Sequence, residues 1–130
     1  MSEKTKTVIG SVIWNDLTVK NADEISNFYS EVVGWKPEAV NMGSYNDFNM
    51  NRPEDEVTGA GICHARGTNA NLPAQWLIYI AVADVDKSIE RCRSLGGKTI
   101  TPVKHMQGYG RYCVIQDPAG AVCALFEAQK

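Results

Sequence analysis

The polar side chains best suited to chemistry in this sequence are few, and they lie in or beside short apolar stretches. Asp16 stands within such a stretch, where a carboxylate can act as a base or pair with a cationic ligand. An equally good alternative is a structural carboxylate that bonds the neighbouring strand or Arg111. His64 is one of two histidines, and a lone histidine is more often structural than catalytic. We therefore name Asp16 and His64 as candidate catalytic residues, with structural roles as the alternative.

A glycine-rich segment, Gly108-Tyr109-Gly110-Arg111, is the second region that could bind a ligand. Its glycines predict a mobile loop, and the Arg111 guanidinium could hold a carboxylate or phosphate through two hydrogen bonds. The alternative is an arginine on an edge strand that pairs with Asp117 or Glu127. His105, in the preceding loop, is expected to be exposed. No serine or cysteine nucleophile with a supporting histidine and acid is indicated, and no phosphate-binding glycine loop is present.

The composition fits an ordinary globular protein. At 130 residues, 44% apolar and 22% charged, the chain can bury a core as one domain, residues 1–130, without a disulfide or metal. A net charge of −2 without a basic stripe gives no reason to expect nucleic acid. No stretch has the length of a membrane span or the pattern of a signal peptide, so we expect no membrane contact and a cytoplasmic location. The four cysteines form no C-x-x-C pair, which disfavours a zinc ribbon and predicts reduced thiols.

Two amphipathic helices can be predicted from the spacing of apolar residues. The first follows Asn21, which has Glu24 at the spacing of a capping box, and Gly34 is placed to end it in a left-handed conformation. Its apolar stripe is Ile25, Phe28, Tyr29, Val32 and Val33. The second helix begins after Asp84 or Asp86 and ends at a Gly-Gly pair. Its stripe is Val85, Ile89, Cys92 and Leu95.

The same pattern recurs after 63 positions. An apolar strand precedes each helix, at residues 12–19 and 76–82. A shift of 63 places Trp14 on Leu77 and Gly34 on Gly97, so that strand, helix and stop recur in one register. The sequence therefore predicts a duplicated unit.

Three shorter strands are expected after each helix. They are residues 38–40, 45–50 and 59–65 in the first half and residues 98–103, 110–115 and 121–126 in the second. The segment Asp117-Pro118-Ala119-Gly120 has the residues of a type I turn and should join the last two strands. Residues 68–73 are the best linker, which gives a first βαβββ module at 8–67 and a second at 74–127.

These segments resemble one superfamily in order and spacing. The first half reads L-T-V-K-N-A-D-E-I-S-N-F-Y-S-E-V-V-G-W; the second reads Y-I-A-V-A-D-V-D, S-L-G-G-K, G-Y-G-R-Y and D-P-A-G-A-V-C-A-L-F-E. Together they resemble the vicinal-oxygen-chelate proteins, among them glyoxalase I, bleomycin resistance proteins and extradiol dioxygenases, from about Val8 to Glu127. The resemblance implies the α+β class, with two βαβββ modules that form a curved mixed sheet around a cleft.

In metal-dependent members of that superfamily, His, Gln or Glu side chains on the first and last strand of each module bind a divalent metal. Carried over residue by residue, these positions fall on Trp14, Leu77 and Ala124, with the fourth near residues 61–63. Trp, Leu and Ala offer no suitable donor for a divalent metal. The expectation is therefore no metal and no cofactor, which puts glyoxalase I and extradiol dioxygenase activity in doubt.

Strand alternation then predicts which side chains share the implied cleft with these positions. The expected ligand-binding residues are Trp14, Asp16, Tyr45, Phe48, Cys63, Leu77, Tyr79, Arg111, Ala124 and Phe126, with Tyr45 and Phe48 as alternatives to each other and His64 as an alternative to Cys63. An apolar, aromatic wall with few polar groups suits a flat organic ligand. The alternative is that these aromatic side chains fill the space that the metal would occupy.

Two classes of function follow. The first is a small-molecule-binding protein similar to bleomycin resistance proteins, with a metal-free cleft for an aromatic or cationic organic molecule. The second is a lyase, isomerase or dioxygenase-like enzyme of the same superfamily that uses Asp16, His64 or a tyrosine as acid or base. A homodimer is expected from the resemblance.

Overall fold

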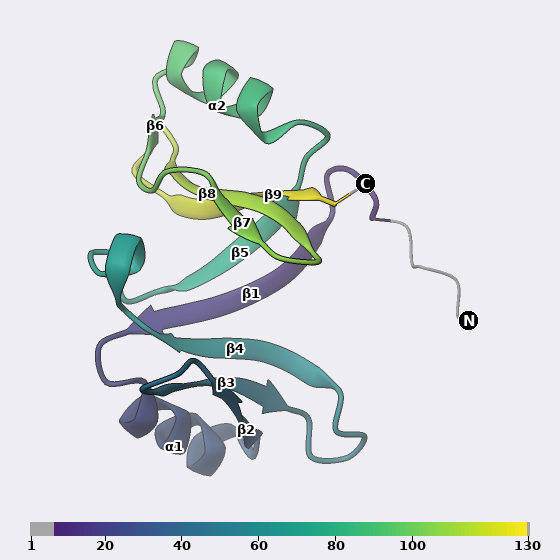
Figure 1. The fold of residues 1–130 in the computed structure, drawn as a ribbon, viewed down its shortest axis with the longest axis vertical. Coiled ribbons are helices and arrows are strands. Elements are labelled where there is room, and N and C mark those ends of the chain that lie inside the picture. Colours follow the sequence, from purple (N-terminus) through teal and green to yellow (C-terminus); the bar gives the residue numbers. More distant parts are fainter. Residues whose placement is uncertain (1–6, 130) are drawn as a thin grey trace. The chain divides into compact units, whose positions relative to one another are not determined.

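The structure, a computed structural model, describes residues 7–129 and divides them into two units (Figure 1). The first unit is Asn15–Trp76, and the second combines residues 7–14 with residues 77–129 of the described chain. The sequence expectation began the first module at residue 8. The physical reason for the difference is a pair of backbone hydrogen bonds that ties the chain start to the second unit, from Gly10 N to Ala81 O (2.8 Å) and from Ala81 N to Ser11 O (2.9 Å).

The first unit is a mixed sheet with one helix. Its elements are β1 (Val12–Val19), whose first residues belong to the second unit, α1 (Ala22–Val33), β2 (Lys36–Asn41), β3 (Asn46–Asn51), β4 (Thr58–His64) and a 3₁₀ turn, η1 (Gly67–Asn69). The strand order is β2-β3-β4-β1, with β1 parallel to β4 and the other pairs antiparallel. Helix α1 lies along one face of this sheet (Figure 1).

Both ends of α1 were predicted from the sequence, and one mechanism was wrong. Gly34 ends the helix in the left-handed region (φ 90°) and donates its N–H to Ser30 O, which confirms the predicted stop. The Asn21 side chain makes no capping bond to the backbone; its amide instead donates to the Glu24 carboxylate at 3.2 Å. The expected capping box is therefore replaced by a bond between the two side chains.

The core of the first unit lies between α1 and the sheet. It is built on Leu17, Ala22, Met50 and Ile62, with partly buried Val19, Ile25, Tyr29, Trp35, Phe48 and Trp76 around them. The predicted apolar stripe is only partly buried, because Ala22 and Ser26 are the fully buried positions of the helix. Small side chains let the helix approach the sheet along this line and leave Phe28, Val32 and Val33 at 52–64% exposure.

The second unit repeats the plan. Its elements are β5 (Trp76–Ala81), which begins at the last residue of the first unit, α2 (Val85–Ser94), β6 (Lys98–Thr99), β7 (Lys104–Met106), β8 (Gly110–Gln116) and β9 (Val122–Ala128). The strand order is β5-β9-β8-β6, and β7 pairs with β8. The strand expected at residues 98–103 is only two residues long, and His105, expected in a loop, lies exposed in β7.

Local signals in the second unit are confirmed. Asp84 caps α2 by accepting a bond from Lys87 N at 3.1 Å. The Asp117 carboxylate accepts from Ala119 N and Ala121 N, which closes the predicted turn between β8 and β9. Helix α2 covers a core of Val85, Ile89, Cys113 and Leu125. The α+β class and the two βαβββ modules are thus confirmed, and no helix of residues 7–129 is long and apolar enough to cross a membrane.

Candidate functional site

One face of the first unit brings together a carboxylate, a hydroxyl and a thiol. In the parallel pair β1–β4, Leu17 lies opposite Ile62, and both face α1. Because strand side chains alternate, the neighbouring pairs Asp16–Gly61 and Thr18–Cys63 face the other side. Asp16 is 8% exposed. Asp16 and Cys63 thus lie on the same face of this sheet.

Asp47 joins this face, and sequence reasoning missed it. Its carboxylate hydrogen-bonds the Cys63 thiol and also accepts from His64 N at 2.8 Å. Burial raises the pKa of Cys63 far above its usual value, and the charges of Asp16 and Asp47 raise it further. The thiol is therefore protonated and no nucleophile, and the potential at this point is negative. The signal in the sequence that could have identified Asp47 was the alternation of side chains along β3, which places Asp47 on the face of the sheet opposite to that of Phe48.

Phe48 itself is a correction. It pairs with Ile62 across β3–β4 and packs in the core beneath α1. Phe48 therefore lies on the opposite face of the sheet from Asp16 and Cys63, not on the face where it was expected. The reason is register: the pairing of β3 with β4 decides which of two neighbouring residues faces α1.

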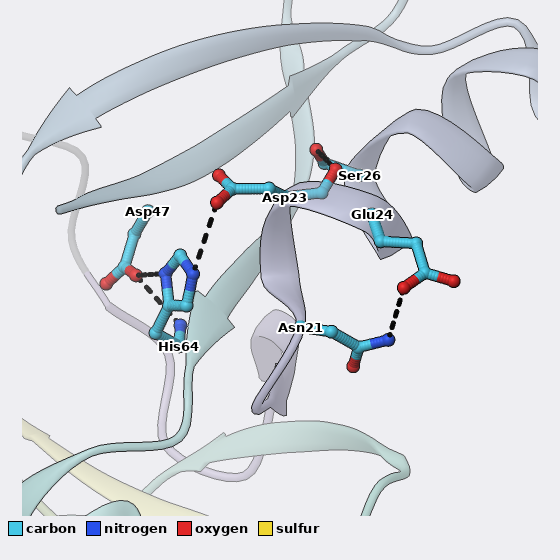
Figure 2. Close-up of polar contacts among 6 residues, drawn as sticks. All are labelled: Asn21, Asp23, Glu24, Ser26, Asp47 and His64. Carbon is cyan, nitrogen blue, oxygen red and sulfur yellow. Dashed lines mark hydrogen bonds and ion pairs between the residues drawn. The ribbon is translucent and has the colours of Figure 1, made fainter.

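His64 lies on the α1 side of β4, between two carboxylates (Figure 2). Its Nδ1 is 3.4 Å from Asp47 Oδ1, and its Nε2 is 3.7 Å from Asp23 Oδ2 in the first turn of α1. The side chains of His64 and Asp47 are 14% and 15% exposed, whereas that of Asp23 is 77% exposed. The Asp47 carboxylate is thus held by its surroundings, whereas the exposed Asp23 side chain has room to change its rotamer.

Tyr45 and Arg66 extend this group. The Tyr45 ring meets the His64 ring edge-on, with centroids 5.3 Å apart, and the Arg66 guanidinium lies 4.0 Å above Tyr45. Tyr45 therefore belongs with His64. Of the two catalytic candidates, His64 has the orienting carboxylate that proton transfer by a histidine requires.

The apolar candidates of the second unit share one face of its sheet. Tyr79 pairs with Ala124, and Phe126 follows on the same side, opposite to Leu125 and α2. Leu77 and Ala124 are fully buried, and Tyr79 and Phe126 are each 8% exposed. The Tyr79 ring contacts Tyr112 at 5.8 Å. The alternation was predicted well, and the near-complete burial favours the alternative that these side chains fill space. Trp14, also grouped with this unit, is half-buried.

Arg111 is held in ion pairs. Its Nη2 donates to Glu127 Oε1 at 2.8 Å and to Asp86 Oδ2 at 3.0 Å. These bonds raise the pKa of Arg111. The pKa of Glu127 is lowered mainly by the hydrogen bond that its carboxylate accepts from Val85 N, and next by the bond from Arg111. The pairing with Glu127 was one of two predicted alternatives; Asp117 closes the turn between β8 and β9 instead. An open depression of about 440 Å³ adjoins the group, lined by His105, Gly110, Arg111, Glu127, Ala128 and Gln129.

The segment before Arg111 is a tight hairpin between β7 and β8. Tyr109 N donates to Met106 O, and Gln129 N donates to Tyr109 O. Gly110 adopts φ 151°, and a Cβ there would lie 2.0 Å from Glu127 O. The glycines therefore serve close packing against β9, which the expectation of a mobile loop did not foresee.

The residues at the superfamily's metal positions do not fit a metal. Leu77 and Ala124 are buried and offer no nitrogen or oxygen donor. Within residues 7–129, no group of three or more His, Cys, Asp or Glu side chains could hold a metal ion. Leu77 and Ala124 can therefore supply no ligand to a divalent metal.

Comparison with known proteins identifies relatives across almost the whole chain. Residues 9–125 match the model of the Glyoxalase/Bleomycin resistance protein/Dioxygenase superfamily. Two curated relatives are "Putative glyoxylase CFP32" of Mycobacterium tuberculosis, 25% identical over 118 residues, and the anthracycline biosynthesis protein DnrV of Streptomyces peucetius, 27% identical over 136 residues. The matches cover 91% and 94% of this chain but only 44% and 48% of those proteins. The chain thus spans about half the length of these relatives.

Solved structures show the same fold at low sequence identity. Methylmalonyl-CoA epimerase from Mycobacterium tuberculosis aligns with a TM-score of 0.55 at 14% identity, over 98% of this chain and 94% of the epimerase. A homoprotocatechuate 2,3-dioxygenase from B. fuscum aligns with a TM-score of 0.57 at 18% identity, over 94% of this chain and 33% of the dioxygenase. At such identities the likeness concerns the fold alone.

Proposed function

Because the chain belongs to the glyoxalase/bleomycin resistance protein/dioxygenase superfamily, we propose that it binds a small organic cation, aromatic or aliphatic, without a metal at the superfamily's positions. The observation that carries the proposal is the face of the first unit where Asp16 and Asp47 flank Cys63. Two carboxylates in a largely buried setting attract a positive charge more strongly than exposed ones do. The relative DnrV, named for anthracycline biosynthesis, supports a small organic ligand.

Matched pairs of ligands test this proposal. A panel of aromatic and aliphatic ammonium compounds is compared with neutral isosteres by thermal shift, since a ligand that binds the folded state raises its stability, by about 2.7 kcal/mol at a hundredfold excess over Kd. Asp16→Asn and Asp47→Asn should each weaken binding of a cationic hit about tenfold or more. Glu54→Gln, at an exposed turn residue, is the control and should leave it unchanged. Equal binding of neutral and cationic partners, or indifference to both variants, would contradict the proposal.

A second candidate is an enzyme in which His64 acts as base or acid. It is favoured by Asp47, whose oxygen lies beside Nδ1 and leaves Nε2 as the reacting nitrogen. If a hit from the panel is turned over, His64→Gln should abolish turnover and leave the affinity within about threefold. Turnover that survives this variant would exclude the role for His64.

We also propose that two copies of the chain pair. The chain spans under half of its curated relatives, and α1 leaves Phe28, Val32 and Val33 exposed. Light scattering over a range of concentrations should give twice the 14.3 kDa mass of one chain. A mass of one chain at all concentrations would refute the pairing.

A cytoplasmic location is the last part of the proposal. All four cysteines are free, and burial raises the pKa of the Cys113 and Cys123 thiols, which keeps them protonated. Thiol titration of protein extracted without reductant should find four free thiols per chain; fewer would argue for an oxidising compartment.

A further inference from the structure

We propose that two copies of the chain pair through the outer edges of their β2 strands, which run antiparallel about a two-fold axis at Val40. This inference rests on the pairing of two copies proposed above and names the surface that carries it. β2 is the outermost strand of the first unit (Figure 1). Among residues 7–129, only β3 pairs with it, and all six of its residues are exposed. The backbone groups on its outer side are therefore open to another strand.

The hydrogen bonds of the β2–β3 hairpin show which backbone groups face outward. Met42 N donates to Tyr45 O, so the backbone of residue 42 faces β3. Because this direction alternates along a strand, the even-numbered residues of β2 face β3 and the odd-numbered ones face outward. Pro37 is an outward residue, so its missing N–H costs no bond to β3. Ala39 and Asn41 each present an N–H and a C=O at the free edge.

One register uses these groups fully. If Val40 lies opposite Val40 of the second copy, Ala39 lies opposite Asn41 on both sides of the axis. Each of these two pairs exchanges two hydrogen bonds, and none of the four needs a donor from Pro37. A register with Ala39 opposite Ala39 leaves the Asn41 C=O without a donor, because Pro37 would have to supply it. That register also makes the two Glu38 carboxylates diagonal neighbours, which repel each other.

The symmetry of this contact places both copies of α1 on the same face of the joined sheet. A two-fold axis perpendicular to a sheet reverses the strand direction and keeps each face on its own side. Helix α1 packs on β2, β3 and β4 and leaves Phe28, Val32 and Val33 at 52–64% exposure. The second α1 therefore lies on the same side as the first, and these side chains add apolar burial that four backbone bonds alone do not supply.

The contact closes at two copies. Each chain has one β2, and a two-fold contact uses the same edge of both chains, so no free β2 edge remains to recruit a third. A second copy also matches the length of the relatives: this chain spans 44% and 48% of two of them, which leaves each with enough sequence for a second unit of this size. These two features favour a second copy over an unrelated peptide as the occupant of the edge.

A proline at residue 39 tests the hydrogen bonds. Ala39→Pro removes two of the four donors and none of the bonds to β3, so it should raise the Kd of the dimer about tenfold or more while circular dichroism stays unchanged. Ala39→Ser keeps the N–H and should remain dimeric. Light scattering over a range of concentrations measures both variants beside the unmodified chain.

A disulfide placed on the two-fold axis tests the register. The Cβ atoms of directly opposite residues lie about 4.5–5.5 Å apart, so Val40→Cys should form a covalent dimer with oxidised glutathione on a non-reducing gel. Lys36→Cys is the matched control. In this register the two Lys36 positions lie about 27 Å apart, at about 3.4 Å per residue, so this variant should give no more covalent dimer than the unmodified chain.

The outcomes separate this inference from the pairing on which it rests. A chain that stays monomeric at all concentrations would overturn both. A dimer that survives Ala39→Pro, or that does not cross-link through Val40→Cys, would overturn the β2 contact and leave the pairing itself standing.

Discussion

At the scale of single residues, the important side chains are those whose partners come from another strand. Asp16 could be singled out from the sequence, because a carboxylate within an apolar stretch is conspicuous. Asp47 could not be. Its partners, Cys63 and His64, lie on β4, and only the register between β3 and β4 brings them together. The same register moved Phe48 from the expected site into the core.

Asp47→Asn is expected to destabilise the protein by about 1–2 kcal/mol in urea denaturation, because the largely buried carboxylate accepts from His64 N and lies beside the imidazole ring. Glu54→Gln, at an exposed turn residue, should cost nothing measurable. Equal midpoints for the two variants would mean that Asp47 contributes no net stability.

Glu127 predicts a specific dependence on pH. Its pKa in the folded state is lowered by the bond from Val85 N and by Arg111, so its contribution is present above the unfolded-state pKa and is lost as pH falls through the folded value. Glu127→Gln should therefore cost about 0.5–1 kcal/mol at pH 7, discounted for solvent, and progressively less below about pH 4.5. A cost that stays constant across this range would contradict the assignment.

At the scale of elements, local rules were reliable at ends and turns. The bounds of β1, the stop at Gly34 and the turn after Asp117 all follow from propensity and turn chemistry. The burial of α1 did not follow, because the apolar period allows more than one rotation of the helix. Contact through Ala22 and Ser26 selected one rotation, and that choice depends on the sheet beneath.

The hairpin between β7 and β8 yields a prediction about a single glycine. Gly110→Ala should lower stability by more than about 2 kcal/mol, since its Cβ would meet Glu127 O and φ lies in the left-handed region. Gly43 has φ 103° with open space around it, so Gly43→Ala carries the backbone strain alone and should cost about 1 kcal/mol. Chemical denaturation of both variants measures the difference; an equal loss would mean that packing against β9 is loose.

At the scale of the molecule, the duplicated sequence pattern predicted the class and the repeat of βαβββ modules. That residues 7–14 belong to the second unit could not be predicted from the sequence. It depends on the backbone hydrogen bonds that Gly10 and Ser11 form with the distant Ala81. Both modules keep their helix and sheet.

Pairing of two chains gives a prediction at this scale. If α1 forms the contact, Val32→Glu, at a side chain 64% exposed, should convert the dimer to a monomer with the fold intact, because the charge would be buried on association. Val57→Glu, at a side chain 49% exposed in the loop before β4, is the control and should remain dimeric. Light scattering and circular dichroism check both; a dimer that survives Val32→Glu would place the contact elsewhere.

The most direct test of the central claim is calorimetry of one cationic hit and its neutral isostere against the unmodified protein and Asp16→Asn. We expect the cation to bind at least tenfold more tightly than the isostere, and the preference to vanish in Asp16→Asn while the fold is unchanged. A preference for the cation that persists in Asp16→Asn and in Asp47→Asn would contradict the assignment of this face as the binding site.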